Sequence, residues 1–336
     1  RKGMSGLNQV LRSIIATTAI FELTGAFLLL PVFVPQYGWN YSLWLGMFHS
    51  ISAFNNAGFS LFSNNLIGYQ SSFLVNLVIP GLIIFGGIGY ETIMEMYFWL
   101  RDRIQRKPKR IVFSLNFKVA VSTTLMLLLL GTIVILFAEV GNPGTLEPMP
   151  WGTKLLAAWF QSVTARTAGF NTIDIGQMTP TALFVTIALM FIGGSPGGTA
   201  GGIKTTTLRV LTTCTKAILQ GKEEALIYQR QIPLSLILKS VGVLMGSVAT
   251  VILLTALITI SDPQIDFIRI LFEVVSGFGT VGLSTGITAG LTTFAKLVLI
   301  ASMYIGRVGV LLLMAAILGD PSPSAIRYPE ENLLVG

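Results

Sequence analysis

Long apolar segments recur along the whole chain of 336 residues, and they constrain its fold more than any other feature. Hydrophobic residues make up 52% of the sequence and charged residues only 11%, whereas roughly a quarter of a soluble domain is charged. The composition therefore excludes a soluble fold. Taking about 20 apolar residues for one crossing of a bilayer, we predict an all-α polytopic membrane protein with six spans, at residues 13–34, 72–99, 114–138, 181–218, 234–260 and 293–318.

The charged residues lie mainly in the connections and predict the orientation. Residues 101–110 contain six Lys or Arg against one Asp, and residues 209–239 are also basic. Because cytoplasmic loops are enriched in Lys and Arg, we expect a multi-pass protein of the cell (inner) membrane with both termini of this segment in the cytoplasm. The net charge of +7 is then explained by the lipid bilayer and not by nucleic acid.

A single cysteine and a single histidine limit the chemistry that the side chains can perform. Cys214 permits no intrachain disulfide, and His49 leaves no His/Cys cluster for a transition metal. His49 is expected to be a structural residue. We predict that the chain is not an enzyme and carries no cofactor of its own.

Three similar segments lie in the connections that are expected to face outward. They are residues 48–60, 160–171 and 272–284, and their late glycines Gly58, Gly169 and Gly282 are spaced by 111 and 113 residues. Such spacing indicates an internal repeat. We divide the chain into 1–110, with span, pore loop and span; 111–230, with a broken second span; and 231–336, with the last unit and the C-terminal tail.

Each repeat holds a short apolar helix of about 12 residues, which cannot cross a bilayer and must turn back within it. Non-helical backbone at membrane depth is tolerated where it lines a water-filled cavity, and aligned carbonyls can replace the hydration shell of a cation. No Asp or Glu occurs in the turns, which favours a monovalent cation. The alternative is that the turns merely allow the short helices to pack. The predicted selectivity filter, which would bind K⁺ through backbone carbonyls, comprises Asn56, Ala57, Gly58, Thr167, Ala168, Gly169, Thr280, Val281 and Gly282. Arg166 is expected to bond the carbonyls of neighbouring turns.

The second span of the middle repeat contains a glycine-rich break at mid-membrane depth, which could block or open a path. The predicted gate comprises Gly193, Gly194, Gly197, Gly198, Gly201, Gly202, Lys204 and the pore-facing Arg307. The alternatives are a helix-packing surface, snorkelling of Lys204, and an ion pair of Arg307 with Glu22, Glu91 or Glu95. Because Ile203 separates Gly202 from Lys204, the segment does not match a phosphate-binding loop.

Residues 52–60, 164–172 and 277–284 resemble the pore loops of the Trk/Ktr/HKT potassium transporters, most closely the bacterial Ktr membrane subunit. Residues 193–205 and 304–307 share the resemblance. It implies repeats arranged around a pore like fused potassium-channel subunits, a homodimer, and a cytosolic ring of nucleotide-binding (RCK-type) regulatory subunits, with nucleotide on that partner only. The family has four repeats, and the first does not occur in this sequence. The sequence leaves open whether that repeat belongs to a longer chain of which this is a part, lies on another chain or is missing.

These features predict potassium uptake through a carbonyl-lined filter, driven by the electrochemical gradient and limited by the glycine-rich loop and Arg307. K⁺ is the expected transported ion, and the sequence leaves the choice between K⁺ and Na⁺ and any Na⁺ dependence open. A cation-coupled secondary transporter and a non-conducting assembly subunit remain as alternatives.

Overall fold

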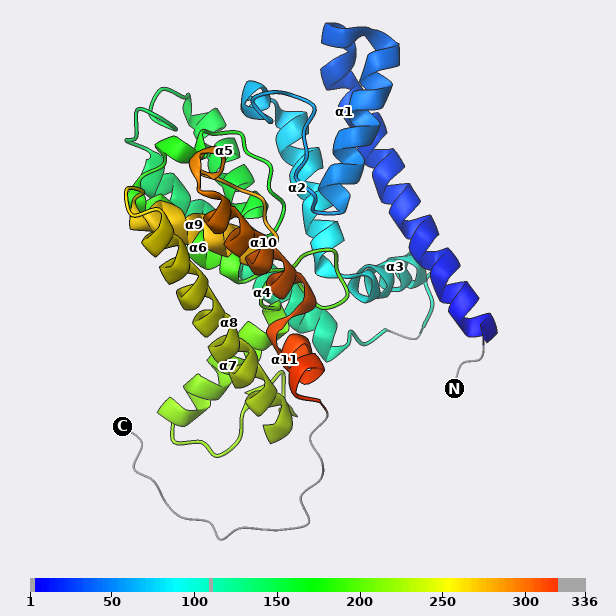
Figure 1. Ribbon diagram of the computed structural model, residues 1–336. Coiled ribbons are helices and arrows are strands. Elements are labelled where there is room, and N and C mark those ends of the chain that lie inside the picture. The colour runs from blue at the N-terminus through cyan, green and yellow to red at the C-terminus, as the bar shows by residue number, and fades with distance from the viewer. Residues whose placement is uncertain (1–3, 109–110, 320–336) are drawn as a thin grey trace.

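Long apolar helices form the frame of the computed structural model, which describes residues 4–108 and 111–319 (Figure 1). Three of the described helices are long and apolar enough to cross a membrane on their own: α1 (Met4–Phe54), α4 (Leu115–Glu139) and α8 (Leu234–Ser261). Large apolar side chains on α4 and α8 stay exposed, with Phe137 at 76% and Ile260 at 79%. Such exposure suits a surface in contact with lipid tails. The sheet in the described part is a short antiparallel pair, β1 (Leu226–Ile227) and β2 (Arg230–Gln231).

Helix α1 consists of two limbs that fold back on each other (Figure 1). The change of direction occurs at Gly38, whose backbone lies outside the helical region with φ 73° and ψ 171°. The Ser50 hydroxyl on the second limb donates to the carbonyl of Glu22 on the first, over 2.5 Å. The first limb corresponds to the predicted span at 13–34, and the second is the short helix of the first repeat.

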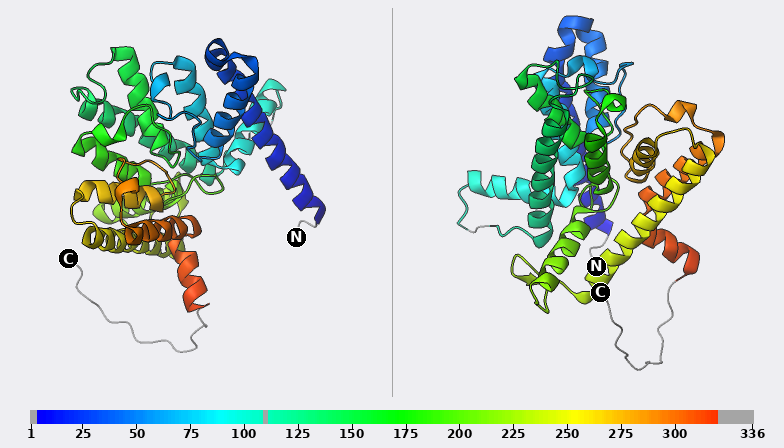
Figure 2. Two further views of the ribbon diagram at one scale, coloured as in Figure 1. Left: turned by 45° about the horizontal axis from the view of Figure 1, so that its top comes forward. Right: turned by 90° about the vertical axis from the view of Figure 1, so that its left-hand side faces the viewer.

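The other two short helices are α5 (Trp151–Thr164) and α9 (Phe267–Phe278). Both begin with an exposed aromatic residue and continue into the assembly of longer helices, where Phe160 and Phe272 are fully enclosed. Figure 2 shows α9 grouped with α8 and α10 (Thr293–Val308) on one side of the molecule. The short helices therefore end inside the protein, where their C-terminal carbonyls meet other backbone.

The second span of every repeat is interrupted, which corrects two of the predicted spans. The segment 72–99 is α2 (Phe73–Ile88) followed by α3 (Tyr90–Ile104) at 105°, and 293–318 is α10 followed by α11 (Val310–Leu318) at 95°. Gly89 and Gly309 lie at these bends with φ of 100° and 90°, a conformation that interrupts the helical hydrogen-bond ladder.

The predicted break in the middle repeat is present, between α6 (Pro180–Phe191) and α7 (Thr205–Leu219). Counting each bent pair as one span gives up to five candidate spans among the described residues, against the six predicted, because α6 is too short to qualify.

Buried carboxylates fix the start of two second helices. Glu139 accepts hydrogen bonds from the backbone N–H and hydroxyl of Thr179, over 2.8 and 2.6 Å. Asp262 accepts the equivalent bonds from Thr292, over 3.1 and 2.8 Å. Thr179 and Thr292 are the N-caps of α6 and α10, so each carboxylate neutralises the end of a helix. Short 3₁₀ turns occur at Ile67–Tyr69, Ile175–Gln177 and Thr288–Gly290, ahead of the second helices.

Several orientation signals fall outside the described residues. They are the two ends of the chain, with residues 1–3 and 320–336, and residues 109–110 of the basic connection. The predicted cytoplasmic position of the termini therefore stays a prediction.

Candidate ion pathway

The three predicted filter turns adopt the same backbone shape. Each begins with a residue of left-handed conformation, namely Asn56 (φ 52°), Thr167 (φ 67°) or Thr280 (φ 55°). Each has a left-handed glycine two residues later, with φ of 71° at Gly58, 91° at Gly169 and 92° at Gly282. The sequence indicated left-handed backbone at the three glycines. It gave no indication of left-handed backbone at the two threonines, because a β-branched residue rarely takes positive φ. A shared polar residue two positions before each glycine was the available signal.

The turns lie side by side in the order of the repeats. A Cβ atom added to Gly58 would lie 2.3 Å from the carbonyl oxygen of Ala168, and one added to Gly169 would lie 2.3 Å from that of Val281. The Asn56 amide and the Thr167 hydroxyl, 3.2 Å apart, join the first two turns. The structure therefore brings all nine predicted filter residues together, and it leaves no room for a side chain at the first two glycines.

A cavity of about 560 Å³ lies between the first and third turns. Its walls include Asn56 and Ala57 of the first turn together with Thr280, Val281 and Gly282 of the third. The middle turn is fully buried behind them, whereas Gly282 and Ala57 are exposed. The middle turn contacts both of the others, whereas the cavity is lined by the first and third turns. Thr199, Glu273 and Arg307 are also among the residues that line the cavity.

Glu273 lines the cavity of the candidate site but was not predicted from the sequence. It lies on α9, is 7% exposed, and accepts hydrogen bonds from the hydroxyls of Ser284, over 2.9 and 3.2 Å, and of Thr288. The repeat alignment contained a signal, since Glu273 occupies the position of His49 and Gln161. His49 Nε2 lies 3.0 Å from the hydroxyl of Ser60, and its Nδ1 lies 2.7 Å from the carbonyl of Leu45. Two hydrogen bonds hold the histidine in place, whereas the glutamate places a carboxyl group at the cavity wall.

The glycine-rich segment 192–204 forms a closed loop between α6 and α7. Its base is held by a parallel bridge between Ile192 and Ile203, and the N–H of Gly193 donates to the carbonyl of Ile203 over 2.8 Å. A Cβ on Gly193 would lie 1.6 Å from the carbonyl oxygen of Gly201. The two sides of the loop can approach this closely only because glycine lacks a side chain.

The loop is bonded to the first repeat at several points. The N–H groups of Ser195 and Thr199 donate to the carbonyls of Gly87 and Gly86, each over 3.0 Å. The Thr199 hydroxyl donates over 3.2 Å to the carbonyl of Phe54, where the first short helix ends. The loop therefore lies beside the predicted filter turns. It donates hydrogen bonds to backbone carbonyls that have no helical partner at the end of α2.

Two buried or partly buried cations also hold the loop. Arg166 is almost fully buried, and its Nη2 donates to the carbonyl of Gly193 over 2.5 Å. The predicted bonds from Arg166 to neighbouring filter turns are not those in the structure, because the guanidinium extends to the loop instead. Lys204 donates to the carbonyl of Ala200 over 2.7 Å, within the loop itself.

Arg307 faces the cavity and touches the loop. Its Nη1 donates to the carbonyl of Thr199 over 3.3 Å. Among the described residues it makes no ion pair with Glu22, Glu91 or Glu95. Glu22 instead accepts from the Asn55 amide over 2.7 Å, and Glu95 binds Ser114 at the start of α4. The ion-pair alternative for Arg307 is thus not the arrangement found.

Comparison with known proteins gives a consistent result. Residues 1–328 match the family TrkH, described as a cation transport protein. The chain is 41% identical to the Ktr system potassium uptake protein B of Bacillus subtilis, over 94% of this chain and 68% of the relative. It is 36% identical to the potassium/sodium uptake protein NtpJ of Enterococcus hirae, over 99% of this chain and 73% of that protein.

A solved structure has a similar fold. The crystal structure of the potassium transporter TrkH from Vibrio parahaemolyticus aligns with a TM-score of 0.71 at 18% identity, over 96% of this chain and 65% of that one. The chain thus spans about two thirds of the length of the proteins it resembles. At this identity the similarity concerns the fold alone, and it confirms the predicted all-α membrane architecture.

Proposed function

The chain belongs to the TrkH family of cation transport proteins, and from this premise we propose that it moves K⁺ across the cell membrane along a path lined by backbone carbonyls. Membership confirms the resemblance seen in the sequence, and the family and its named relatives are ion transporters and not enzymes. The main support for the path is the common shape of the three turns, each with left-handed backbone at its first residue and at its glycine.

The turns suit a dehydrated alkali cation better than any side-chain site would. Carbonyl oxygens from several turns can replace the water around the ion, and the three short helices direct the negative ends of their dipoles toward the turns. Glu273 adds a carboxylate at the cavity wall. In our proposal the filter consists of residues 56–58, 167–169 and 280–282, and Glu273 raises the local concentration of cations before they enter it.

The gate in this proposal is segment 192–204 together with Arg307. The segment lies against the ends of the first short helix and of α2, so it must move if ions are to pass on that side. A fixed positive charge at Arg307 repels a cation in the cavity, and this repulsion is strong where little water screens it. Its bond to Thr199 links the charge to the position of the loop.

The remaining parts of the proposal come from the family and its named relatives. The protein is a multi-pass membrane protein, and we place it in the cell membrane with both ends of this segment inside. A homodimer and a cytosolic ring of nucleotide-binding subunits would regulate it. The Enterococcus relative is named for both potassium and sodium uptake, so Na⁺ is the competing ion to test.

The test is uptake of ⁸⁶Rb⁺ into liposomes that contain the purified protein, with K⁺ and Na⁺ as competitors. We expect saturable uptake that K⁺ inhibits at much lower concentration than Na⁺. Gly58→Ala should abolish this selectivity, and Gly141→Ala, whose Cβ would meet nothing within 4 Å, is the matched control. Uptake that follows an imposed Na⁺ gradient would favour a coupled transporter. Folded protein without any flux would favour an assembly subunit and contradict the proposal.

A further inference from the structure

Helix α3 is oriented differently from the helices around it. It leaves α2 at 105° after Gly89, and it projects sideways from the bundle in Figure 2. Because α2 is an apolar helix that runs with the membrane spans, a helix at this angle lies close to the plane of the membrane. Glu95 fixes α3 to the start of α4 by accepting from the N–H and hydroxyl of Ser114, over 2.9 and 2.6 Å.

The exposed side of α3 carries an apolar stripe. Tyr97, Leu100 and Ile104 follow the spacing of one helix face and are exposed by 55%, 50% and 72%. Successive residues of a helix are rotated by about 100° around its axis. This rotation places Arg101 on one side of the stripe and Arg103 on the other. An apolar stripe flanked by arginines is typical of a helix that lies in the membrane interface, with its apolar face among the acyl chains and its cations at the level of the phosphates.

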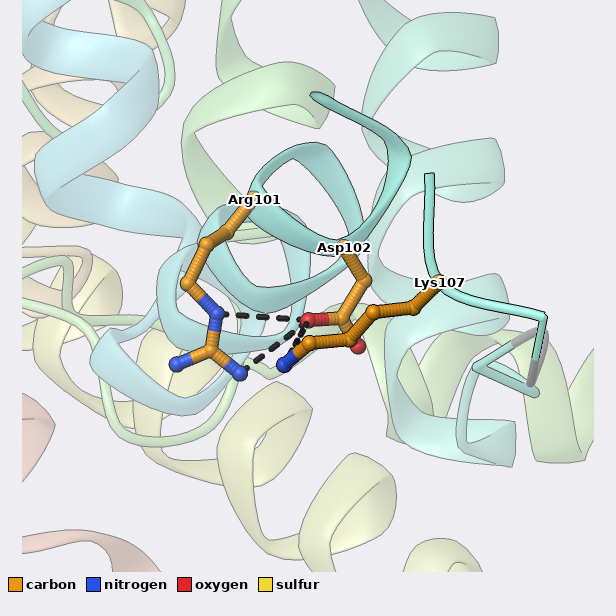
Figure 3. A network of polar contacts seen from close by, with 3 residues as sticks. All are labelled: Arg101, Asp102 and Lys107. Atoms are coloured by element: carbon orange, nitrogen blue, oxygen red, sulfur yellow. Dashed lines mark hydrogen bonds and ion pairs between the residues drawn. The ribbon is translucent and has the colours of Figure 1, made fainter. Parts of the chain in front are cut away.

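The only acidic residue in this part of the helix is already neutralised. Asp102 lies on the face opposite the stripe and pairs with Arg101 over 3.1 Å and Lys107 over 3.4 Å (Figure 3). Desolvation raises the pKa of the Asp102 carboxyl, but hydrogen bonds and charge attraction from Arg101 and Lys107 outweigh it and lower the pKa below its ordinary value of 3.8. The end of α3 therefore keeps a net positive charge, with Arg103 and Arg106 unneutralised by any described carboxylate.

We propose that α3 is a docking surface for anionic phospholipid of the inner leaflet, with Arg103, whose charge no described carboxylate neutralises, contacting lipid phosphate and the Tyr97–Leu100–Ile104 stripe lying among the acyl chains. Arg103 also lies over the ring of Trp99, 5.3 Å from its centroid, and Arg101 lies 4.9 Å from the centroid of Phe98. These contacts keep the guanidinium groups near the helix surface, which suits a site at the headgroup level.

The position of α3 connects this surface to the loop at 192–204. The N–H of Tyr90, the first residue of α3, donates to the carbonyl of Gly197 over 3.3 Å. A Cβ on Gly89 would lie 2.6 Å from the carbonyl oxygen of Pro196. A shift of α3 at the membrane surface therefore moves directly against the loop. This consequence for gating rests on the proposed function, whereas lipid docking does not and is measured without ion flux.

The first experiment locates the stripe in the bilayer. Cys214 is the only cysteine in the sequence, so Cys214→Ser with Leu100→Cys offers one site for an environment-sensitive fluorophore. Cys214→Ser with Gln105→Cys is the matched control, because Gln105 is exposed but lies away from the stripe. In vesicles of phosphatidylglycerol with brominated acyl chains, we expect several-fold stronger quenching at position 100 than at position 105. Equal, weak quenching at both positions would overturn the proposal.

The second experiment tests the headgroup. Native mass spectrometry counts the phosphatidylglycerol and phosphatidylcholine molecules retained by the folded protein. Each basic residue at an anionic surface contributes about five-fold in binding, so Arg103→Gln should reduce the preference for phosphatidylglycerol by about five-fold. Lys216→Gln with Lys222→Gln, in the other basic segment, should leave it unchanged. An unchanged preference in the Arg103→Gln variant, or protection of Arg103 only by a cytosolic protein, would refute lipid docking.

Discussion

Substituting Gly169, the glycine of the middle turn in the proposed filter, separates the effect of backbone strain from that of steric conflict. Gly169 and Gly282 have nearly the same φ, 91° and 92°, so alanine at either position carries a similar left-handed penalty of about 1–2 kcal/mol. Their surroundings differ, because a Cβ at Gly169 would lie 2.3 Å from the Val281 carbonyl oxygen, whereas one at Gly282 has Gly169 Cα at 3.8 Å.

The difference in contact distance sets the expected size of the effect. A carbon and a carbonyl oxygen approach to about 3.3 Å at the closest, so Gly169→Ala must displace the Val281 carbonyl by about 1 Å. In the proposed pathway that carbonyl binds the ion. We therefore expect Gly169→Ala to reduce the preference for Rb⁺ over Na⁺ by at least about ten-fold, or about 1.4 kcal/mol, and Gly282→Ala to change it much less.

The assay is competition of Na⁺ with ⁸⁶Rb⁺ uptake in liposomes, and the thermal unfolding of each variant in detergent is recorded beside it. Both alanine variants should lose similar stability from the shared backbone strain, with a further loss at Gly169. If the two variants have the same ion preference while both remain folded, then the packing of Gly169 on Val281 does not shape a filter, and the reasoning fails.

Three further outcomes follow from the same contacts. Arg166→Gln removes the charged donor to the Gly193 carbonyl, so basal Rb⁺ uptake should rise several-fold with unchanged ion preference, as measured by the same competition assay. Glu273→Gln, which keeps the hydroxyl contacts but removes the charge, should raise the KM for Rb⁺ more than it lowers the maximal rate. Hydrogen bonds from Ser261, opposed by desolvation and aided by Thr292, lower the pKa of Asp262 below its ordinary 3.8. The stability that ionised Asp262 provides is therefore complete above about pH 4 and is lost as the pH falls through the lowered pKa. The Asp262→Asn variant should melt at a lower temperature at pH 7, and its melting temperature should no longer fall with acid in this range.

The sequence predicted the turns because their information is local and repeated. Three glycines at near-constant spacing, each after a short apolar helix, were enough to identify residues 56–58, 167–169 and 280–282 as one kind of turn. The left-handed threonines could not be predicted from their own propensity, which opposes that conformation. Thr167 is contacted by the Asn56 amide of the neighbouring turn, 111 positions away, and Thr280 packs against Gly201 of the glycine-rich loop.

The bends at Gly89 and Gly309 were missed for a different reason. Glycine inside an apolar run is compatible with a continuous membrane helix, so the runs 72–99 and 293–318 gave no indication of a break. The partners that accommodate the first bend lie on the loop of another repeat, at Pro196 and Gly197. The target of Arg166 was missed for the same reason, since Gly193 is remote from it in sequence.

The loop at 192–204 and the bend at Gly89 satisfy each other's backbone groups. When α2 ends at Ile88, its last carbonyls lose their helical partners, and two of them, on Gly86 and Gly87, accept from the N–H groups of Thr199 and Ser195. Leaving such groups buried without partners costs about 1–3 kcal/mol each. Movement of the loop away from α2 is therefore favourable only if water reaches these carbonyls, so in the proposed gate the entry of water into the cavity and the opening of the loop are one event.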